Sequence, residues 1–144
     1  MFCFFRGKTG TGRLNRRPAA NNVMQTNKLK ISILIPCHNE EQSVESCVRS
    51  CFRQTRLPDE VVVVNDGSTD NSARILGQFS HAIKMVTILK ATGNKSHAQE
   101  YGLGFITGDV VITTDADTLL DQNFVAETEK SFQDPEVPPT TTAK

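Results

Sequence analysis

Short, largely apolar runs alternate along this chain with segments in which apolar residues recur at helical spacing. The runs occupy residues 31–35, 60–64, 85–89 and 110–113, and polar or turn-forming residues flank each of them. Runs of this length with little polar alternation favour strands that are covered on both faces of a sheet. The sequence therefore predicts four buried strands.

The segments between and after these runs show the period of an amphipathic helix. The clearest case follows the spacing i, i+3, i+4, i+7, i+8 and comprises Val44, Cys47, Val48, Cys51 and Phe52. Similar spacing within residues 75–79, 98–106 and 124–132 predicts three more helices. Asn39 and Gln42 are the expected capping pair of the first helix. The alternation of strand and helix predicts an α/β fold, a mostly parallel sheet with helices on both faces and the first strand at its centre.

The two ends of the chain lack any apolar period. Residues 1–30 carry seven Lys or Arg and no acid, so residues 31–144 hold nine bases, all sixteen acids and a net charge of −7. We therefore expect a basic, disordered arm over residues 1–29, one domain over residues 30–136 and a disordered tail over residues 137–144. A domain this acidic is a poor partner for nucleic acid.

Cysteine usage and hydropathy indicate the compartment. The four cysteines form neither a C-x-x-C motif nor a disulfide framework, and Cys47 and Cys51 fall on the apolar side of the first predicted helix. No apolar run reaches the roughly 18 residues that a membrane span needs. These features predict a reduced, cytoplasmic domain without a membrane span, and the cytoplasmic face of a membrane is the alternative location.

Polar loops follow the first, second and fourth predicted strands, at residues 36–40, 65–70 and 115–118. The carboxyl ends of parallel strands share one edge of the sheet, and ligands bind at that edge in open α/β folds. Capping residues and helix amino termini there suit the phosphates of a nucleotide. The sequence therefore predicts that the three loops form one ligand site.

The third loop contains two carboxylates, Asp115 and Asp117, directly after the fourth strand. Strand side chains alternate with period 2, so residues i and i+2 leave on the same side and these carboxylates are expected to converge. A divalent cation would relieve their repulsion and keep open positions for phosphate oxygens. The alternative is a polar loop that only caps the next helix.

Four motifs occur in one order. They are ILIPCHNEE at residues 33–41, VVNDGSTD at 63–70, GNK at 93–95 before YGL at 101–103, and GD at 108–109 leading to DADT at 115–118. With these motifs the chain resembles the GT-A type inverting glycosyltransferases of family 2, which include the cellulose, chitin, hyaluronan and poly-N-acetylglucosamine synthases. The resemblance implies a GT-A, Rossmann-like donor-binding domain. It also implies transfer of a sugar from a UDP-sugar to the hydroxyl of a saccharide or other acceptor, in polysaccharide or glycoconjugate synthesis.

The resemblance implies roles for residues at the nucleotide base. The loop that contains Pro36, His38, Asn39 and Glu40 would line the base, and the His38 imidazole would stack on uracil. Asp66 would accept a hydrogen bond from the ring N–H of uracil, a donor that cytosine lacks.

The resemblance also implies roles at the diphosphate. Lys95 would contact the phosphate oxygens as a point charge. Asp115 and Asp117 would hold Mg²⁺ or Mn²⁺, with Asp115 also facing the donor, and the metal would help UDP to leave.

The chain departs from the family pattern after the metal motif. The acceptor half of the family supplies the general base and a Gln-x-x-Arg-Trp segment, whereas this sequence has no Trp and no residue that matches the base. We expect a truncated donor-binding half that is inactive alone, from a family whose full-length members are often membrane-associated. A non-catalytic nucleotide-binding remnant is one alternative. A haloacid-dehalogenase-type phosphatase is another, but there the D-x-D follows the first strand, and Leu119 stands where that group has Thr or Val.

Overall fold

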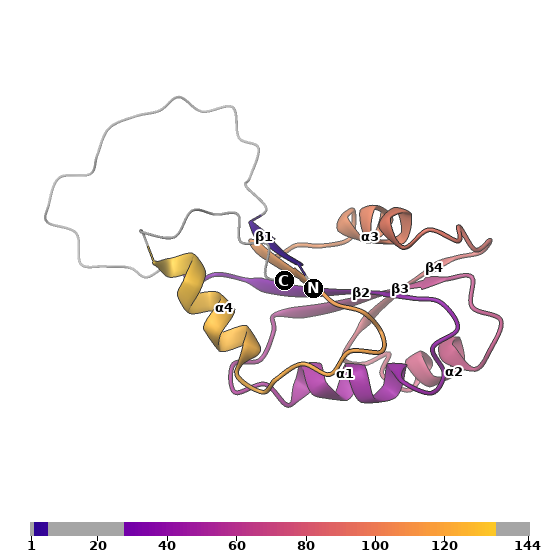
Figure 1. Ribbon diagram of the computed structural model, residues 1–144, viewed down its shortest axis with the longest axis horizontal. Coiled ribbons are helices and arrows are strands. Elements are labelled where there is room, and N and C mark those ends of the chain that lie inside the picture. The colour runs from indigo at the N-terminus through magenta and orange to yellow at the C-terminus, as the bar shows by residue number, and fades with distance from the viewer. Residues whose placement is uncertain (1, 6–27, 135–144) are drawn as a thin grey trace, which may run out of the picture.

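A five-stranded sheet is the framework of the structure (Figure 1). This computed structural model describes residues 2–5 and 28–134. Its elements are β1 Phe2–Phe5, β2 Ile31–Cys37, α1 Val44–Phe52, β3 Glu60–Asp66, α2 Ser72–Gly77, β4 Lys84–Ile88, α3 Lys95–Leu103, β5 Val110–Thr113 and α4 Phe124–Gln133. All four predicted strands and all four predicted helices are present, and the predicted α/β class is confirmed.

The order of the strands places β2 at the centre of the sheet, as the sequence predicts. The order is β1-β5-β2-β3-β4, and β2 pairs in parallel with both β3 and β5. Ile33 lies opposite Val61 on one side and Ile112 on the other. Every residue of β2 is buried, because strands flank it on both edges and helices cover both faces.

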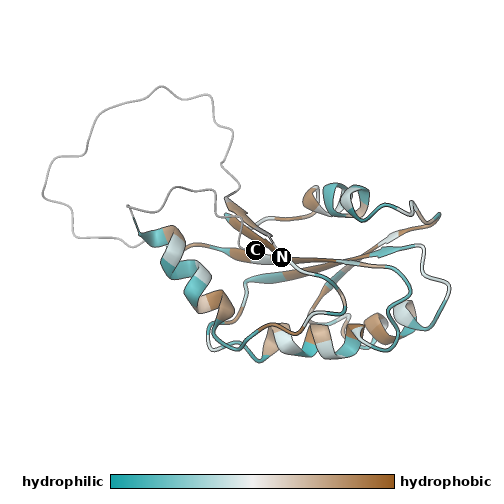
Figure 2. Cartoon of the chain, viewed as in Figure 1, coloured by the Kyte–Doolittle hydropathy of each residue, from teal (hydrophilic) through white to brown (hydrophobic). Residues whose placement is uncertain are grey.

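Helices cover the two faces of the sheet unequally. Helices α1, α2 and α4 lie on one face and α3 lies on the other (Figure 1). Ile33 and Ile35 of β2 pack with Cys47 of α1 in the larger core, whereas Leu34 packs with Ala98 of α3 in the smaller one. This alternation follows the period of a strand. The central strands are accordingly largely hydrophobic, and the helices carry both kinds of residue (Figure 2).

Helix α3 approaches the sheet closely at Gly102. A Cβ atom there would lie 2.5 Å from Leu34 Cδ1 and 2.7 Å from Val64 Cγ2, and both of these side chains are fully buried. Because neither side chain can move away without disturbing the core, we expect Gly102→Ala to lower the free energy of unfolding by about 1–3 kcal/mol. Urea unfolding followed by circular dichroism measures this change.

The same substitution at Gly77 is the matched control. Gly77 is the last residue of α2, and a Cβ there meets nothing within 4 Å. Gly77→Ala should leave stability unchanged or raise it by about 0.5–1 kcal/mol, because alanine has less freedom to lose in a helix. Equal effects of the two substitutions would contradict the close packing of α3.

The prediction of a disordered arm over residues 1–29 is wrong for residues 2–5. Residues 2–5 form β1, which pairs antiparallel with β5 and places Phe2 opposite Thr113. Without β1, β5 would be an open edge strand with unpaired backbone N–H and C=O groups. A short apolar segment with high β-propensity can pair with these groups. Residues 1 and 6–27 of the predicted arm and the predicted tail, residues 137–144, lie outside the described residues.

Candidate donor-binding site

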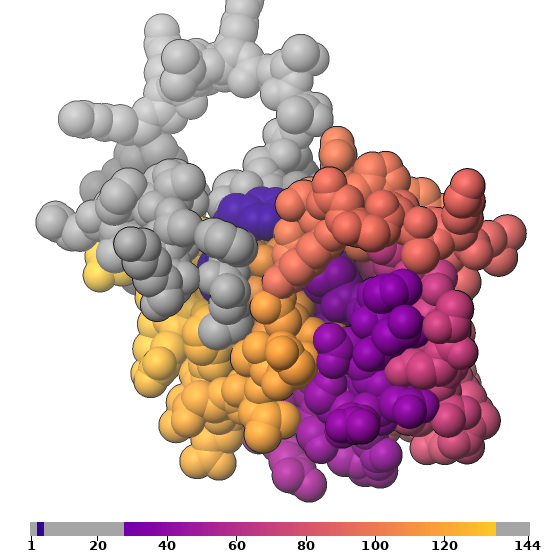
Figure 3. All heavy atoms as spheres, turned by 45° about the vertical axis from the view of Figure 1, so that its right-hand side comes forward, coloured from indigo at the N-terminus to yellow at the C-terminus, as the bar shows by residue number. Residues whose placement is uncertain are grey.

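A cleft with a volume of about 280 Å³ lies at the carboxyl ends of the parallel strands. Its walls come from the three polar loops that the sequence singles out and from the loop before α3, and this face of the molecule is turned forward in Figure 3. The lining residues are Pro36, Cys37, His38, Glu40, Asp66, Gly93, Asn94, Lys95, Ala98, Asp115, Ala116 and Asp117. The three loops therefore lie together at one edge of the sheet, as the sequence predicts.

The cleft begins where β2 and β5 part. The last backbone contact between them is the hydrogen bond from Thr114 N to Leu34 O, at 3.1 Å. Backbone groups alternate sides along a strand, so Pro36, two residues beyond Leu34, would direct an N–H toward β5 if it had one. Proline has none, and β5 has already ended at Thr113. A proline is thus accommodated in a central strand, and no donor is left unpaired where the sheet opens.

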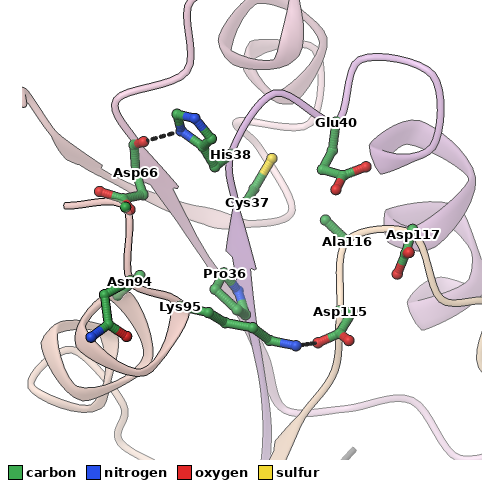
Figure 4. A pocket seen from close by; sticks show the side chains of 12 residues that line it. Pro36, Cys37, His38, Glu40, Asp66, Asn94, Lys95, Asp115, Ala116 and Asp117 are labelled. Carbon is green, nitrogen blue, oxygen red and sulfur yellow. Dashed lines mark hydrogen bonds and ion pairs between the residues drawn. The ribbon is translucent and has the colours of Figure 1, made fainter. Parts of the chain in front are cut away.

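One end of the cleft is built around Asp66, the last residue of β3. The Asp66 side chain is buried, and it accepts hydrogen bonds from Thr92 N at 2.9 Å and from Thr92 Oγ1 at 2.7 Å. The Asp66 carbonyl oxygen accepts a hydrogen bond from His38 Nδ1 at 2.6 Å (Figure 4). Because a carbonyl can only accept, Nδ1 carries the proton, and this bond fixes the orientation of the exposed imidazole ring.

Asn39 does not line the cleft but joins two of its loops. It adopts a positive φ of 52°, its Oδ1 accepts a hydrogen bond from Thr69 N at 2.8 Å, and its N–H donates to Ser68 Oγ at 3.0 Å. Asparagine tolerates this left-handed conformation better than most residues. The predicted capping pair of Asn39 and Gln42 is wrong: α1 begins after Ser43, whose side chain makes no capping hydrogen bond. The Asn39 amide instead serves the loop after β3.

Lys95 and Asp115 form an ion pair across the other end of the cleft (Figure 4). Lys95 is the first residue of α3, and Asp115 follows β5. Both side chains are about half exposed, at 53% and 44%, so each is free to take another partner. Asp117 is exposed and lines the same cleft.

Asp115 and Asp117 both line the cleft, but not through the alternation of strand side chains that the sequence predicts. Strand β5 ends at Thr113, and a backbone hydrogen bond of 3.1 Å from Thr118 N to Asp115 O closes a turn. The alternation of a strand therefore does not apply at these positions, and a turn brings both carboxylates to the cleft wall.

The chemistry of these side chains fits a hard divalent cation. Two carboxylates on a turn supply oxygen ligands, and Mg²⁺ is commonly held by one or two carboxylates together with phosphates of a substrate. Within residues 2–5 and 28–134 no group of three or more His, Cys, Asp or Glu side chains is arranged to hold a metal ion. A cation held by these two carboxylates would need further oxygen ligands, such as phosphate oxygens or water.

Several residues of the cleft are absent from the sequence-based set of site residues. Cys37, Gly93, Asn94, Ala98 and Ala116 also line it. Burial raises the pKa of the Cys37 thiol to about 11, so this thiol is neutral at physiological pH. Of these residues, Asn94 also has a local signal in the sequence, as an asparagine two residues before a serine at a helix start. Its side chain accepts a hydrogen bond from Ser96 N and caps α3.

No helix in the described part of the chain has the length and hydrophobicity to cross a bilayer.

Comparison with known sequences identifies relatives. Residues 32–137 match the family model "Glycosyl transferase family 2". Glycosyltransferase GlyA of Streptococcus pneumoniae serotype 4 is 35% identical over 97 residues, which are 67% of this chain and 14% of that protein. A poly-β-1,6-N-acetyl-D-glucosamine synthase of Staphylococcus epidermidis is 33% identical over 95 residues, 65% of this chain and 23% of the synthase. The chain thus spans less than a third of the length of these relatives.

Solved structures show the same fold. A mannosyltransferase of Pyrobaculum calidifontis, in complex with GDP-Man and Mn²⁺, superposes with a TM-score of 0.69 and 26% identity over 83% of this chain and 37% of that one. S. aureus TarS in complex with UDP-GlcNAc gives 0.68 and 23% identity over 73% and 31%. These likenesses confirm the GT-A fold that the motifs imply. From the matched family and the shared fold together, we conclude that the chain belongs to glycosyl transferase family 2.

Proposed function

We propose that this domain binds a UDP-sugar together with Mg²⁺ or Mn²⁺ and presents the sugar for transfer to an acceptor hydroxyl. The observation that carries the proposal is the convergence of Asp66, Lys95, Asp115 and Asp117 on one cleft at the carboxyl ends of parallel strands. Each of these residues suits one part of a nucleotide diphosphate. Membership of the family supports the reaction class, and the mannosyltransferase complex with Mn²⁺ supports the use of a metal.

At the base end, Asp66 has the chemistry to select uracil. Its carboxylate accepts two hydrogen bonds from Thr92 and has lone pairs left for a third donor. The ring N–H of uracil is such a donor, whereas the corresponding nitrogen of cytosine is an acceptor and would repel a carboxylate. The exposed His38 ring, held by its bond to the Asp66 carbonyl, offers a flat surface for the base to stack on.

At the other end, Lys95 and the two aspartates have the charges that a diphosphate requires. Asp115 and Asp117 would hold the metal, which would neutralise the negative charge that grows on UDP as the bond to the sugar breaks. Lys95 carries a compact positive charge within the same cleft and would bind phosphate oxygens directly.

The acceptor and its general base belong to a part of the enzyme that these residues do not supply. The chain matches only 14–23% of the two relatives described above, and none of its residues matches the family's base. We therefore expect the isolated domain to bind the donor without transferring sugar at a useful rate, because positioned base catalysis contributes about 10²–10⁴-fold.

Titration calorimetry with UDP and CDP in the presence of Mn²⁺ tests the proposal. UDP should bind more tightly than CDP, and Asp66→Ala should weaken UDP binding about tenfold by removing one charge-assisted hydrogen bond. CDP binding should stay unchanged or become slightly tighter in this variant, because the repulsion from the carboxylate is removed. Equal affinity of the wild type for UDP and CDP, or wild-type selectivity in Asp66→Ala, would contradict the proposed role of Asp66.

A further inference from the structure

We propose that Thr92 is a positioning residue that makes the cleft selective for uracil by holding the Asp66 carboxylate in one orientation. This inference rests on the proposed function, in which Asp66 recognises the base. Thr92 does not itself line the cleft, so it acts through Asp66.

Thr92 contacts both oxygens of the carboxylate. Its N–H donates to Oδ1 at 2.9 Å, and its hydroxyl donates to Oδ2 at 2.7 Å. Two donors on the two oxygens fix the rotation of the carboxylate plane, which is otherwise broad for aspartate. Asp66 is only 4% exposed, so water does not compete effectively for these bonds. The lone pairs that remain free therefore have a fixed direction.

The backbone is shaped to let this contact form. Gly67 has a positive φ of 59°, and a Cβ there would lie only 2.5 Å from Ala91 N. Glycine thus allows the segment before Thr92 to press against the end of β3. This close approach brings the Thr92 N–H within reach of Asp66.

Thr92 also connects the two ends of the cleft. Its Oγ1 accepts a hydrogen bond from Asn94 N at 3.3 Å, across a turn in which Gly93 has a φ of 63°. Asn94 caps α3 through its 2.9 Å bond to Ser96 N, and Lys95 is the first residue of that helix. The hydroxyl therefore lies between Asp66 and the turn that leads to α3, while the cap of that helix comes from the Asn94 side chain.

A fixed carboxylate discriminates between bases more strongly than a mobile one. In its fixed orientation it meets the N–H of uracil without losing rotational freedom, which favours UDP. In the same orientation the carboxylate faces the acceptor nitrogen of cytosine and repels it. Because a fixed carboxylate cannot turn away, this repulsion disfavours CDP. Release of the carboxylate should therefore weaken UDP binding and leave CDP binding unchanged or slightly improved.

Calorimetry on Thr92→Val with UDP and CDP, both with Mn²⁺, tests this inference. Valine keeps the shape and the backbone N–H but removes the hydroxyl. We expect UDP affinity to fall about fivefold and CDP affinity to change less than about twofold, so that the ratio of the two falls about fivefold. Thr92→Ser retains the hydroxyl and should keep the wild-type ratio. Thr87→Val, on exposed β4 outside the cleft, is the matched control.

The outcomes separate the two proposals. Loss of both affinities by the same factor in Thr92→Val, or a wild-type ratio, overturns the role of Thr92 and leaves the proposed function intact. A wild type that does not prefer UDP overturns the proposed function itself. Thermal unfolding verifies that each variant is folded, and Thr92→Ala, a second variant without the hydroxyl, must give the same fall in the ratio as Thr92→Val.

Discussion

Asp115→Asn should weaken Mn²⁺-dependent UDP binding about 100-fold, because removal of a charged metal ligand costs several kcal/mol. Asp115 lines the cleft and has a half-exposed side chain, so a cation can reach it without any rearrangement of the core. Calorimetry with UDP in the presence of Mn²⁺, and again in the presence of a chelator, measures the effect. In the chelator the wild type and the variant should bind UDP with similar, weak affinity.

The same substitution at Asp121 provides the control. Asp121 is exposed, lies outside the cleft and accepts a hydrogen bond from Asn123 N at 2.9 Å, a role that an asparagine side chain can also fill. Asp121→Asn should bind UDP and Mn²⁺ like the wild type. If a chelator left the UDP affinity of the wild type unchanged, Asp115 and Asp117 would not be metal ligands, whatever the variants showed.

Lys95→Met should change metal binding and UDP binding in opposite directions. In the ion pair of Lys95 with Asp115, the ammonium occupies a carboxylate that the proposed metal ion would need. Its removal should strengthen the binding of Mn²⁺ alone about threefold, a small gain because exposed ion pairs are weak. UDP in the presence of Mn²⁺ should bind about 30-fold more weakly, since a charge-assisted contact with the diphosphate is lost.

Calorimetry with Mn²⁺ alone, and then with UDP added, measures both changes in one preparation. Lys90→Met is the matched control, because Lys90 is exposed in the loop after β4 and lies outside the cleft. Weaker binding of both Mn²⁺ and UDP in Lys95→Met would show that Lys95 supports the aspartates and does not compete for them.

The α/β fold could be predicted because each buried element of the sheet carries its own pattern. Strand β3 is buried on two faces and therefore has a continuous run of β-branched residues. Helix α1 is buried on one face and therefore shows helical spacing of its apolar residues. Strand β1 could not be predicted in this way. It has four residues, too few to show a period, and it is a strand only because β5 offers it an open edge.

The cleft could be predicted at the level of loops but not at the level of contacts. Polar residues after strands identify the sheet edge, and the family motifs add roles for Asp66, Lys95 and Asp115. No local pattern shows that Thr92 would reach Asp66, because that contact joins residues 26 apart in the chain and depends on the close approach at Gly67. The turn that redirects Asp115 and Asp117 is likewise set by a backbone hydrogen bond that side-chain spacing does not reveal.

The pairing of β1 with β5 has a consequence for the order of folding. The partners of β2 and β3 are 28 residues apart, as with Ile33 and Val61, whereas Phe2 and Thr113 are separated by almost the whole described chain. Closing the longer loop costs more entropy, and the pairing of only four residues offsets that cost. We therefore expect β1 to join last, on a parallel sheet that has already assembled, and to open locally while the strands that carry the cleft stay paired.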